Sequence, residues 1–290
     1  MLRITASVIN RVLLAPFGLR LVRTKWDAPD PHPTLPGGPF SAFGEEAILR
    51  GLIARIPDIG KTYADIGAGD GITWSNTCRL AIDGWRGIAF EYNLAKVHAM
   101  AAAYATLDNV RVCHARITPK NVCVFLDAYE LPQHFGVLSL DIDSYDYFVL
   151  QAILTRFRPA IIVAEINEKF PPPIDFTRLD GDAPVPLPGL CYGQSISRIA
   201  SLCLPLDYAI AQLEYNNVFL VDRRRLALPG LSPPQAYDQG YRQRPDRLQK
   251  FPYNRNLEPV LTLPPAQALE SLRQHLEPCA GNYTMEISAA

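Results

Sequence analysis

The stretch Tyr63-Ala-Asp-Ile-Gly-Ala-Gly-Asp-Gly71 decides the fold prediction for this chain of 290 residues. Residues 62–66 predict a buried strand, the glycines at 67, 69 and 71 predict a tight turn, and a helix is expected from about Thr73. Glycine adopts positive φ at little steric cost and lets a ligand approach the backbone closely. A strand, a glycine turn and a helix in this order predict a nucleotide-binding site.

The glycine spacing separates two classes of nucleotide ligand. A dinucleotide site has the pattern G-x-G-x-x-G, in which the third glycine follows the second by three residues. That position is Ile72 here, and the turn contains an acidic residue, Asp70, that would repel a pyrophosphate. The same carboxylate is tolerable beside a sulfonium or an adenosine. The turn therefore disfavours NAD as the ligand.

A second predicted strand ends in a carboxylate. It lies in Gly87-Ile-Ala-Phe-Glu-Tyr-Asn93, where Glu91 is suited to accept hydrogen bonds from both hydroxyls of a ribose. Further strands are expected at 110–113, 137–140, 160–164, 208–213 and 218–222, and helices at 41–56, 73–82, 94–105, 122–129, 195–204 and 264–277. Another helix is expected to follow the strand at 137–140 and to run through Arg156. This alternation predicts a doubly wound α/β fold around a mostly parallel sheet.

The motifs at the first two strands are similar to those of a known family. Asp65-Ile-Gly-Ala-Gly-Asp-Gly71 and Glu91 resemble motif I and the following acidic motif of class I S-adenosylmethionine (SAM)-dependent methyltransferases. More segments resemble the FkbM-like branch, which is associated with O-methylation of sugars and natural products: Phe43-Gly-Glu-Glu-Ala-Ile-Leu49, Ile117-Thr-Pro-Lys-Asn-Val122, Leu138-Ser-Leu-Asp-Ile-Asp-Ser-Tyr-Asp-Tyr147 and Pro159-Ala-Ile-Ile-Val-Ala-Glu-Ile-Asn167. The resemblance implies a Rossmann-like sheet of seven strands, closed by an antiparallel hairpin over residues 208–222.

The resemblance also implies where SAM would bind. The methionine part is expected at Asp65 and the backbone of the glycine turn, and the ribose at Glu91. The full set of expected cofactor contacts is Asp65, Gly67, Ala68, Gly69, Gly71, Glu91 and Tyr92. Two plainer interpretations remain open, since Asp65 is also suited to cap the next helix and Glu91 to be a surface acid.

Acidic residues follow the fourth and fifth predicted strands, in Asp141-Ile-Asp-Ser-Tyr-Asp-Tyr147 and Glu165-Ile-Asn167. Carboxylates gathered at one sheet edge repel each other unless a cation or shared protons neutralise them. Hard oxygen ligands of this kind suit Mg²⁺ or Mn²⁺. The opposing interpretation, of equal weight, is that the acids after Ile142 only cap the following helix.

The resemblance gives these acids more specific roles. Asp141, Glu165 and Asn167 resemble the carboxylate-carboxylate-amide metal site of metal-dependent O-methyltransferases, although an Asp would be more usual at position 165. Asp143 is expected to be a further ligand or the general base. The candidate catalytic residues are therefore Asp141, Asp143 and Glu165, and the histidines at 32, 98, 114, 134 and 275 are expected to have packing or surface roles.

The acceptor is expected to be a small molecule or a saccharide. The net charge of −1 shows no electrostatic footprint for nucleic acid. The long connection at 168–192 is expected to supply an aromatic wall of the acceptor pocket from Phe170, Phe176 and Tyr192. A different class of function also stays open, namely a non-catalytic module with a methyltransferase-like fold that binds SAM or a partner.

The chain divides by composition into three parts: a basic amphipathic segment and linker at 1–36, a methyltransferase domain at 37–222, and a proline-rich extension at 223–290 expected to be mostly an arm. The apolar run within residues 1–25 is too interrupted to span a bilayer. It predicts a helix docked on the domain or on a second subunit of a homo-oligomer, an interfacial membrane helix, or a targeting segment. Six cysteines without a C-x-x-C pair predict reduced thiols in a cytoplasmic protein, with a peripheral membrane contact through 1–25 as an option.

Overall fold

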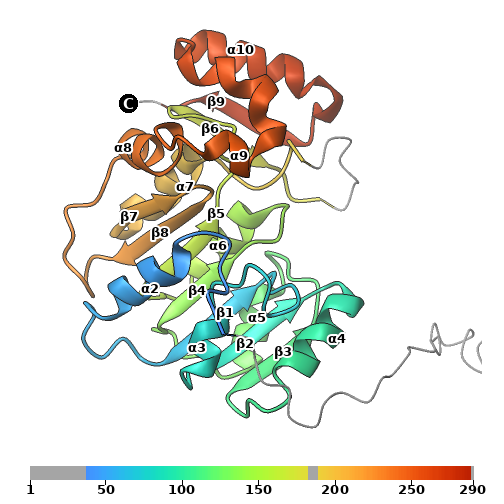
Figure 1. The fold of residues 1–290 in the computed structure, drawn as a ribbon, viewed down its shortest axis with the longest axis vertical. Helices are drawn as coiled ribbons and strands as arrows, with labels where there is room; N and C mark the ends of the chain where they lie inside the picture. Colours follow the sequence, from blue (N-terminus) through green and yellow to red (C-terminus); the bar gives the residue numbers. More distant parts are fainter. Residues whose placement is uncertain (1–36, 182–188, 289–290) are drawn as a thin grey trace, which may run out of the picture. The chain divides into compact units, whose positions relative to one another are not determined.

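The computed structural model describes residues 37–181 and 189–288 (Figure 1). Seven strands form one sheet in the order β3-β2-β1-β4-β5-β8-β7. Their bounds are β1 (Thr62–Ile66), β2 (Arg86–Glu91), β3 (Val110–His114), β4 (Val137–Leu140), β5 (Ile161–Glu165), β7 (Tyr208–Glu214) and β8 (Asn217–Asp222). These strands match the predicted ones to within about a residue at each end, because each is a short apolar run between turn signals.

Strands β1 to β5 are mutually parallel, and β8 pairs antiparallel with both β5 and β7. The strand order reverses beside β1, whose neighbours are β2 on one side and β4 on the other. In open α/β sheets ligands bind at the carboxyl ends of the strands next to such a reversal. The predicted seven-stranded, mostly parallel sheet with its closing antiparallel hairpin is confirmed, and it is the Rossmann-like methyltransferase fold.

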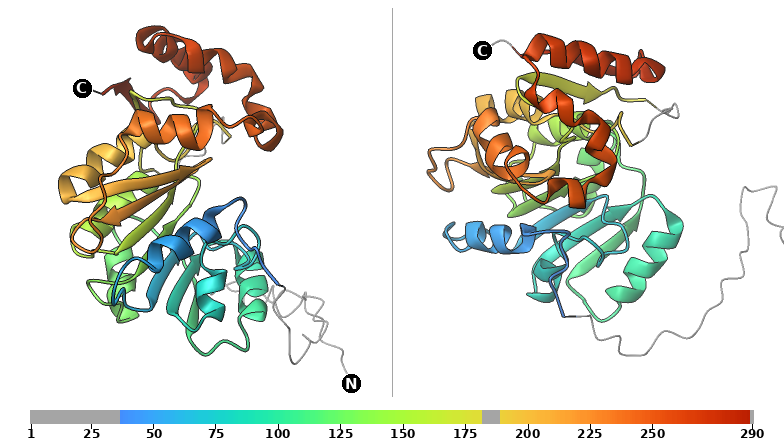
Figure 2. Two further views of the ribbon diagram at one scale, coloured as in Figure 1. Left: turned by 60° about the vertical axis from the view of Figure 1, so that its left-hand side comes forward. Right: turned by 45° about the horizontal axis from the view of Figure 1, so that its top comes forward.

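Helices cover both faces of the sheet, so the fold is doubly wound (Figure 2). One core contains side chains of α2 (Glu45–Ile53), α3 (Cys78–Ile82) and α4 (Leu94–Ala103), and the other contains those of α5 (Val122–Ala128), α6 (Asp146–Leu154) and α7 (Ile196–Cys203). Side chains of β5 alternate between the two cores, with Val163 in the first and Ile162 in the second. A central parallel strand is apolar on both faces for this reason.

The helix after the glycine turn begins later than predicted, at Cys78 and not near Thr73. Side chains occupy the backbone amides that a helix would otherwise use. Asp70 accepts hydrogen bonds from the amides of Ile72 and Thr73, and Ser75 accepts one from Cys78. Such local side-chain to backbone bonds compete with helix formation.

The prediction of an arm after residue 222 is wrong. This part folds into α8 (Pro233–Tyr237), the π-helix η4 (Asp238–Arg242), α9 (Arg247–Lys250), the 3-10 helix η5 (Pro252–Thr262), the predicted helix α10 (Pro265–His275), the short 3-10 helix η6 (Glu277–Cys279) and strand β9 (Tyr283–Ile287). Strand β9 pairs antiparallel with β6 (Ile174–Arg178), which lies in the connection after β5, and α10 packs next to this pair (Figures 1 and 2). A third apolar core between them holds these elements together.

The predicted amphipathic helix at 1–25 and most of the linker lie outside the described residues. The short 3-10 helix η3 (Leu204–Leu206) links α7 to β7 and completes the described elements. Within the part of the chain that the structure describes, no helix is both long and apolar enough to cross a membrane.

Candidate active site

A cavity of about 580 Å³ lies at the carboxyl ends of β1, β2 and β4. Its size is typical of small-molecule sites. Six of the seven expected cofactor contacts line it: Asp65, Gly67, Ala68, Gly69, Glu91 and Tyr92. The exception is Gly71, whose carbonyl accepts a hydrogen bond from Tyr104 at 2.5 Å and whose missing side chain leaves room for Met100. Gly71 therefore serves the packing of α4 against the turn.

Glycine is needed at positions 67 and 69 of the turn for different structural reasons. Gly67 has a φ of +90°, and a Cβ atom there would overlap the carbonyl oxygen of Asp141 at the end of β4. Gly69 has a φ of +60°, but no atom lies within 4 Å of the place where its Cβ would be. Gly67 thus allows two strand ends to meet, while the open side of Gly69 lines the cavity.

Glu91 is held by two backbone amides at the end of β2. Its Oε2 accepts a hydrogen bond from the amide of Gly69 at 3.0 Å, and its Oε1 accepts one from Asn93 at 2.7 Å. The carboxylate is buried except where it lines the cavity. This fixed orientation favours the predicted ribose contact over a solvated surface acid.

Two exposed aromatic side chains border the same cavity. Tyr92 is 68% exposed and Trp74 is 76% exposed. Trp74 was not a predicted site residue, and its φ of +57° is rare for a bulky side chain and typical of functional loops. The only sequence signal was its position three residues after the last glycine of the turn.

Asp65 is buried below the turn and accepts a hydrogen bond from the hydroxyl of Thr77 at 2.6 Å. Burial raises the pKa of Asp65 to about 6. Thr77 immediately precedes α3, so Asp65 contacts the start of this helix as well as lining the cavity. This bond comes from a side-chain hydroxyl and not from a backbone amide, so Asp65 does not cap α3 as the plainer interpretation expected.

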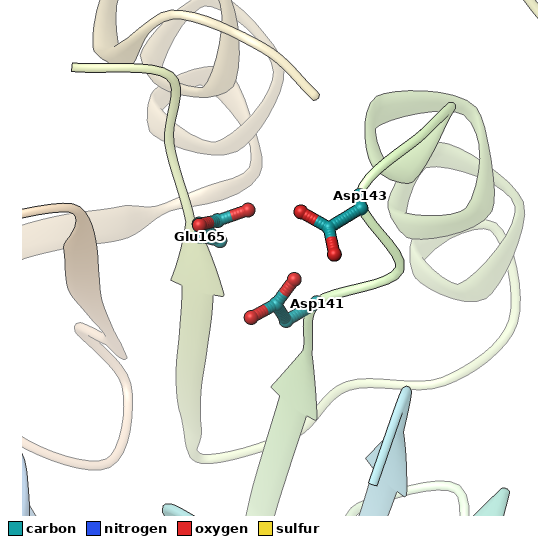
Figure 3. Close-up of side chains that lie close together, drawn as sticks. All are labelled: Asp141, Asp143 and Glu165. Carbon is teal, nitrogen blue, oxygen red and sulfur yellow. The ribbon is translucent and has the colours of Figure 1, made fainter. Parts of the chain in front are cut away.

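Three carboxylates meet where β4 and β5 end (Figure 3). Asp141, Asp143 and Glu165 each place an oxygen within 4.8 Å of the others. Burial, followed by the charges of Asp143 and Asp146, raises the pKa of Asp141 to about 8, and burial next to Asp141 raises the pKa of Glu165. Burial and mutual repulsion therefore favour a retained proton or a bound cation at this cluster, while Lys96 and Lys169 partly offset the charge of Asp143.

Asp146 lies in the first turn of α6, where its charge favours the positive end of the helix dipole, but no side chain caps this helix by a hydrogen bond. The side chain of Asp146 accepts hydrogen bonds from the amides of Ile142 at 2.8 Å and Ser144 at 3.0 Å. Asp143 instead has a φ of +53° and directs its carboxylate toward Asp141 and Glu165 (Figure 3). A strained backbone of this kind persists only where the surrounding structure imposes it.

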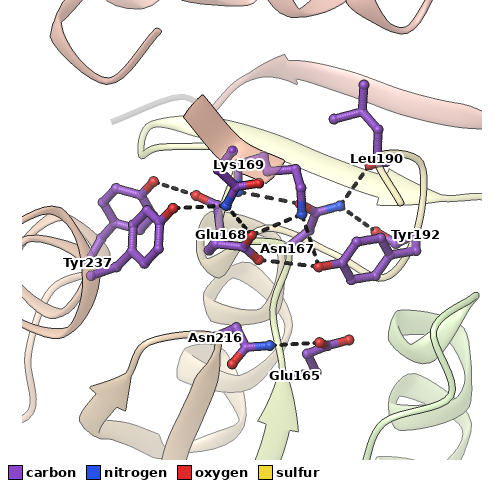
Figure 4. Close-up of polar contacts among 10 residues, drawn as sticks. Glu165, Asn167, Glu168, Lys169, Leu190, Tyr192, Asn216 and Tyr237 are labelled. Atoms are coloured by element: carbon purple, nitrogen blue, oxygen red, sulfur yellow. Dashed lines mark hydrogen bonds and ion pairs between the residues drawn. The ribbon is translucent and has the colours of Figure 1, made fainter. Parts of the chain in front are cut away.

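Asn167, predicted as a metal ligand, has other contacts. Its amide nitrogen donates to the carbonyl oxygens of Leu190 at 2.9 Å and Tyr192 at 3.0 Å (Figure 4). The side-chain amide that contacts the carboxylate of Glu165 is that of Asn216, which donates to Oε1 at 2.8 Å. Asn167 therefore fixes the connection after β5, and its role as a metal ligand stays a prediction that these contacts do not favour.

A second cavity of about 400 Å³ adjoins the carboxylates. It is lined by Asp143, Glu165, Lys169, Gly189, Leu190, Tyr192, Tyr253, Leu257 and His275. Asp143 lines both cavities, so the carboxylate cluster lies where they meet. The last three residues belong to the C-terminal part of the chain, where the sequence carried no recognisable signal.

The predicted aromatic wall is only partly correct. Tyr192 lines the second cavity, but Phe170 and Phe176 are fully buried and stack on each other with ring centroids 3.8 Å apart. They belong to the apolar core that also contains Ala268 and Leu272 of α10. Among the histidines, His275 is exposed, as predicted, and it also lines the second cavity.

Comparison with known proteins gives a likeness of fold. No protein-family model and no curated protein matches the chain. Solved structures similar to it include a SAM-dependent methyltransferase of Aquifex aeolicus (15% identity, TM-score 0.37, 62% of this chain and 90% of that one). A second is M. capricolum TrmK with S-adenosyl-homocysteine (8% identity, TM-score 0.41, 80% of this chain and 94% of that one). A third is magnesium protoporphyrin IX methyltransferase from Synechocystis with SAM (12% identity, TM-score 0.39, 61% of this chain and 76% of that one). The strand order, and not these low scores, carries the assignment of the fold.

Proposed function

We propose that this chain is a SAM-dependent methyltransferase of the FkbM-like type that methylates a hydroxyl group of a sugar, a glycan or a glycosylated small molecule. The observation that carries the proposal is the meeting of two cavities at Asp143. One cavity has the features of a nucleoside site, and the other is polar and aromatic. Methyl transfer needs two ligands whose reacting atoms meet at one point, and this arrangement provides such a point.

The first cavity has residues that fit the parts of SAM. Glu91 is oriented to accept hydrogen bonds from the ribose, and the exposed rings of Tyr92 and Trp74 offer flat surfaces for the adenine. The open side of Gly69 admits the ligand close to the backbone. When bound, SAM supplies an activated methyl group on its sulfonium.

The carboxylate cluster would handle the proton of the acceptor hydroxyl. Asp143 borders the acceptor cavity, so its ionised form is placed to accept this proton, while Asp141 and Glu165 retain a shared proton nearby. A divalent cation, Mg²⁺ or Mn²⁺, is the alternative way to neutralise the cluster. Asp141, Asp143 and Glu165 would hold it, and it would lower the pKa of the acceptor hydroxyl.

Transfer of a labelled methyl group tests the proposal. Wild-type protein should label neutral glycosides in a panel, and Asp143→Asn should lower kcat about 100-fold or more while S-adenosylhomocysteine binding stays unchanged. Asp108→Asn, an exposed acid outside both cavities, is the matched control. Assays with Mg²⁺ and with EDTA separate the cation from the shared proton. Cofactor binding without any transfer would favour the non-catalytic module.

The expected cellular setting also remains a proposal. It comprises a cytoplasmic location, a membrane or subunit contact through residues 1–25, and no nucleic-acid partner. The neutral charge balance and the basic, apolar N-terminal sequence support it. Flotation of the full chain with anionic vesicles, compared with the chain lacking residues 1–25, tests the membrane contact.

A further inference from the structure

Tyr253, in the 3-10 helix η5, is an exposed aromatic residue in the wall of the second cavity. Its side chain is 64% exposed although the neighbouring Asn254 is only 2% exposed. The chain therefore anchors Asn254 in the interior and presents the preceding residue, Tyr253, to the cavity.

The anchor of Asn254 is the buried carboxylate of Glu168. The amide nitrogen of Asn254 donates to Oε1 of Glu168 at 2.6 Å and contacts the hydroxyl of Tyr241 at 3.0 Å. Glu168 follows β5 by three residues, so this bond ties η5 directly to the strand that ends in Glu165. Charge-assisted hydrogen bonds of this kind are strong where water is excluded.

Glu168 has further partners that fix it (Figure 4). Its carboxylate accepts hydrogen bonds from the ammonium group of Lys169 at 2.9 Å and from the hydroxyl of Tyr192 at 3.2 Å, and its carbonyl oxygen accepts one from Tyr237 at 2.5 Å. A buried charge with this many partners holds the surrounding segments in one arrangement. Tyr253 is thereby kept in a fixed position relative to Glu165.

Lys169 links the two aromatic side chains of the cavity. Its ammonium nitrogen lies 4.8 Å from the ring centroid of Tyr192 and 5.4 Å from that of Tyr253. Cation–π contacts at these distances orient the rings, and the bond to Glu168 keeps the lysine in place. The cavity thus combines carboxylates on one side with fixed aromatic rings on another.

We propose that Tyr253 is a specificity-determining residue of the acceptor site and that Asn254 positions it through Glu168; this inference rests on the function proposed above. A sugar ring has hydroxyl groups that suit Asp143 and Glu165 and a face of C–H groups that suits an aromatic ring. Tyr253 supplies that ring from a part of the chain beyond the expected methyltransferase domain. An acceptor with a phosphate or carboxylate at the reacting end would be repelled by the ionised Asp143.

The test compares Tyr253→Ala, Tyr253→Phe and Asn254→Ala with wild-type protein. Methyl α- and β-glycosides of glucose, galactose, mannose and rhamnose are the probes, with labelled SAM and with saturation-transfer NMR for binding. Tyr253→Ala should raise the KM for the accepted glycoside about tenfold with kcat changed less than about threefold, as expected for the loss of one aromatic contact. Tyr253→Phe should restore the wild-type KM, and Asn254→Ala should raise KM as Tyr253→Ala does.

The control is Val124→Ala, because Val124 on α5 is 65% exposed and lines neither cavity. S-adenosylhomocysteine should bind all these variants as it binds the wild type. An unchanged KM in Tyr253→Ala, or a loss confined to kcat, would overturn the inference. So would cofactor binding without binding or methylation of any glycoside, which leaves the cofactor site standing. Failure of the wild type to bind S-adenosylhomocysteine would instead overturn the proposed function itself.

Discussion

The amide of Gly69 donates a hydrogen bond to the carboxylate of Glu91 across 3.0 Å, and this bond joins the glycine turn after β1 to the end of β2. The two motifs of the proposed nucleoside site are therefore one structural unit. The same carboxylate that would bind a ribose also holds the turn, so binding and stability are coupled at this position.

We predict that Glu91→Gln lowers both stability and affinity. The carbonyl oxygen of glutamine can still accept one of the two hydrogen bonds that Glu91 accepts. Its NH₂ group takes the place of the other oxygen and cannot accept a bond, so the amide of either Gly69 or Asn93 loses its partner. The expected loss is about 1–3 kcal/mol in the free energy of unfolding, the cost of one buried donor without a partner. Urea denaturation measures it, and an unchanged midpoint with unchanged cofactor affinity would contradict the coupling.

Alanine at two glycines of the turn should have unequal effects. Gly67→Ala places a methyl group on the Asp141 carbonyl, so we expect a loss of about 3 kcal/mol or more and poorly folded protein. Gly69→Ala has free space and should cost only about 1 kcal/mol for its positive φ. Thermal melts rank the two variants, and equal destabilisation would show that the Asp141 contact is not what requires Gly67.

The pH dependence of stability should report Asp65. Its folded pKa of about 6 lies above the ordinary aspartate value of 3.8, so the folded state holds the proton more tightly than the unfolded chain. This contribution is complete below about pH 4 and is lost as the pH rises through 6, up to about 3 kcal/mol. As the pH rises from 4.5 to 7.5, the free energy of unfolding should therefore fall less in Asp65→Asn than in the wild type.

The pKa values of other carboxyl groups, including Asp146 and Asp141, are also raised, so these groups also lower the stability of the fold as the pH rises. The prediction for Asp65 is therefore the difference between the two pH profiles and not the slope of either one. Guanidinium unfolding at several pH values gives both profiles. Parallel curves for the variant and the wild type would show that Asp65 is not protonated preferentially in the fold.

Local patterns were sufficient to predict the sheet. Its strands are short apolar runs that can be recognised one at a time. The glycine turn at Gly67 and the carboxylate of Glu91 are also local signals, and they predict which edge of the sheet binds a ligand. The strand β6 was not predicted, because its partner β9 lies at the other end of the chain and residues 171–173 are all proline. Pairing between such distant segments leaves no local periodicity to detect.

In the candidate site, the residues that directly follow a strand were predicted, and those placed by tertiary contacts were not. Asp141, Asp143 and Glu165 follow predicted strands, so the topology alone brings them to one edge. Asn167 follows the same strand, but its amide turns to the connection at 190–192, a tertiary contact that the sequence does not indicate. Tyr253 depends on the same kind of contact, through Asn254 and Glu168.

The most direct test of the account is calorimetric titration of S-adenosylhomocysteine into the full chain, beside Glu91→Ala and Asp108→Asn. Wild-type protein and Asp108→Asn should bind one equivalent with micromolar affinity, and Glu91→Ala should lose binding about 30-fold or more, equivalent to about 2 kcal/mol. Circular dichroism would establish that each protein is folded. A folded wild-type protein that binds no S-adenosylhomocysteine would contradict the central claim that the cavity at β1 and β2 is a SAM site.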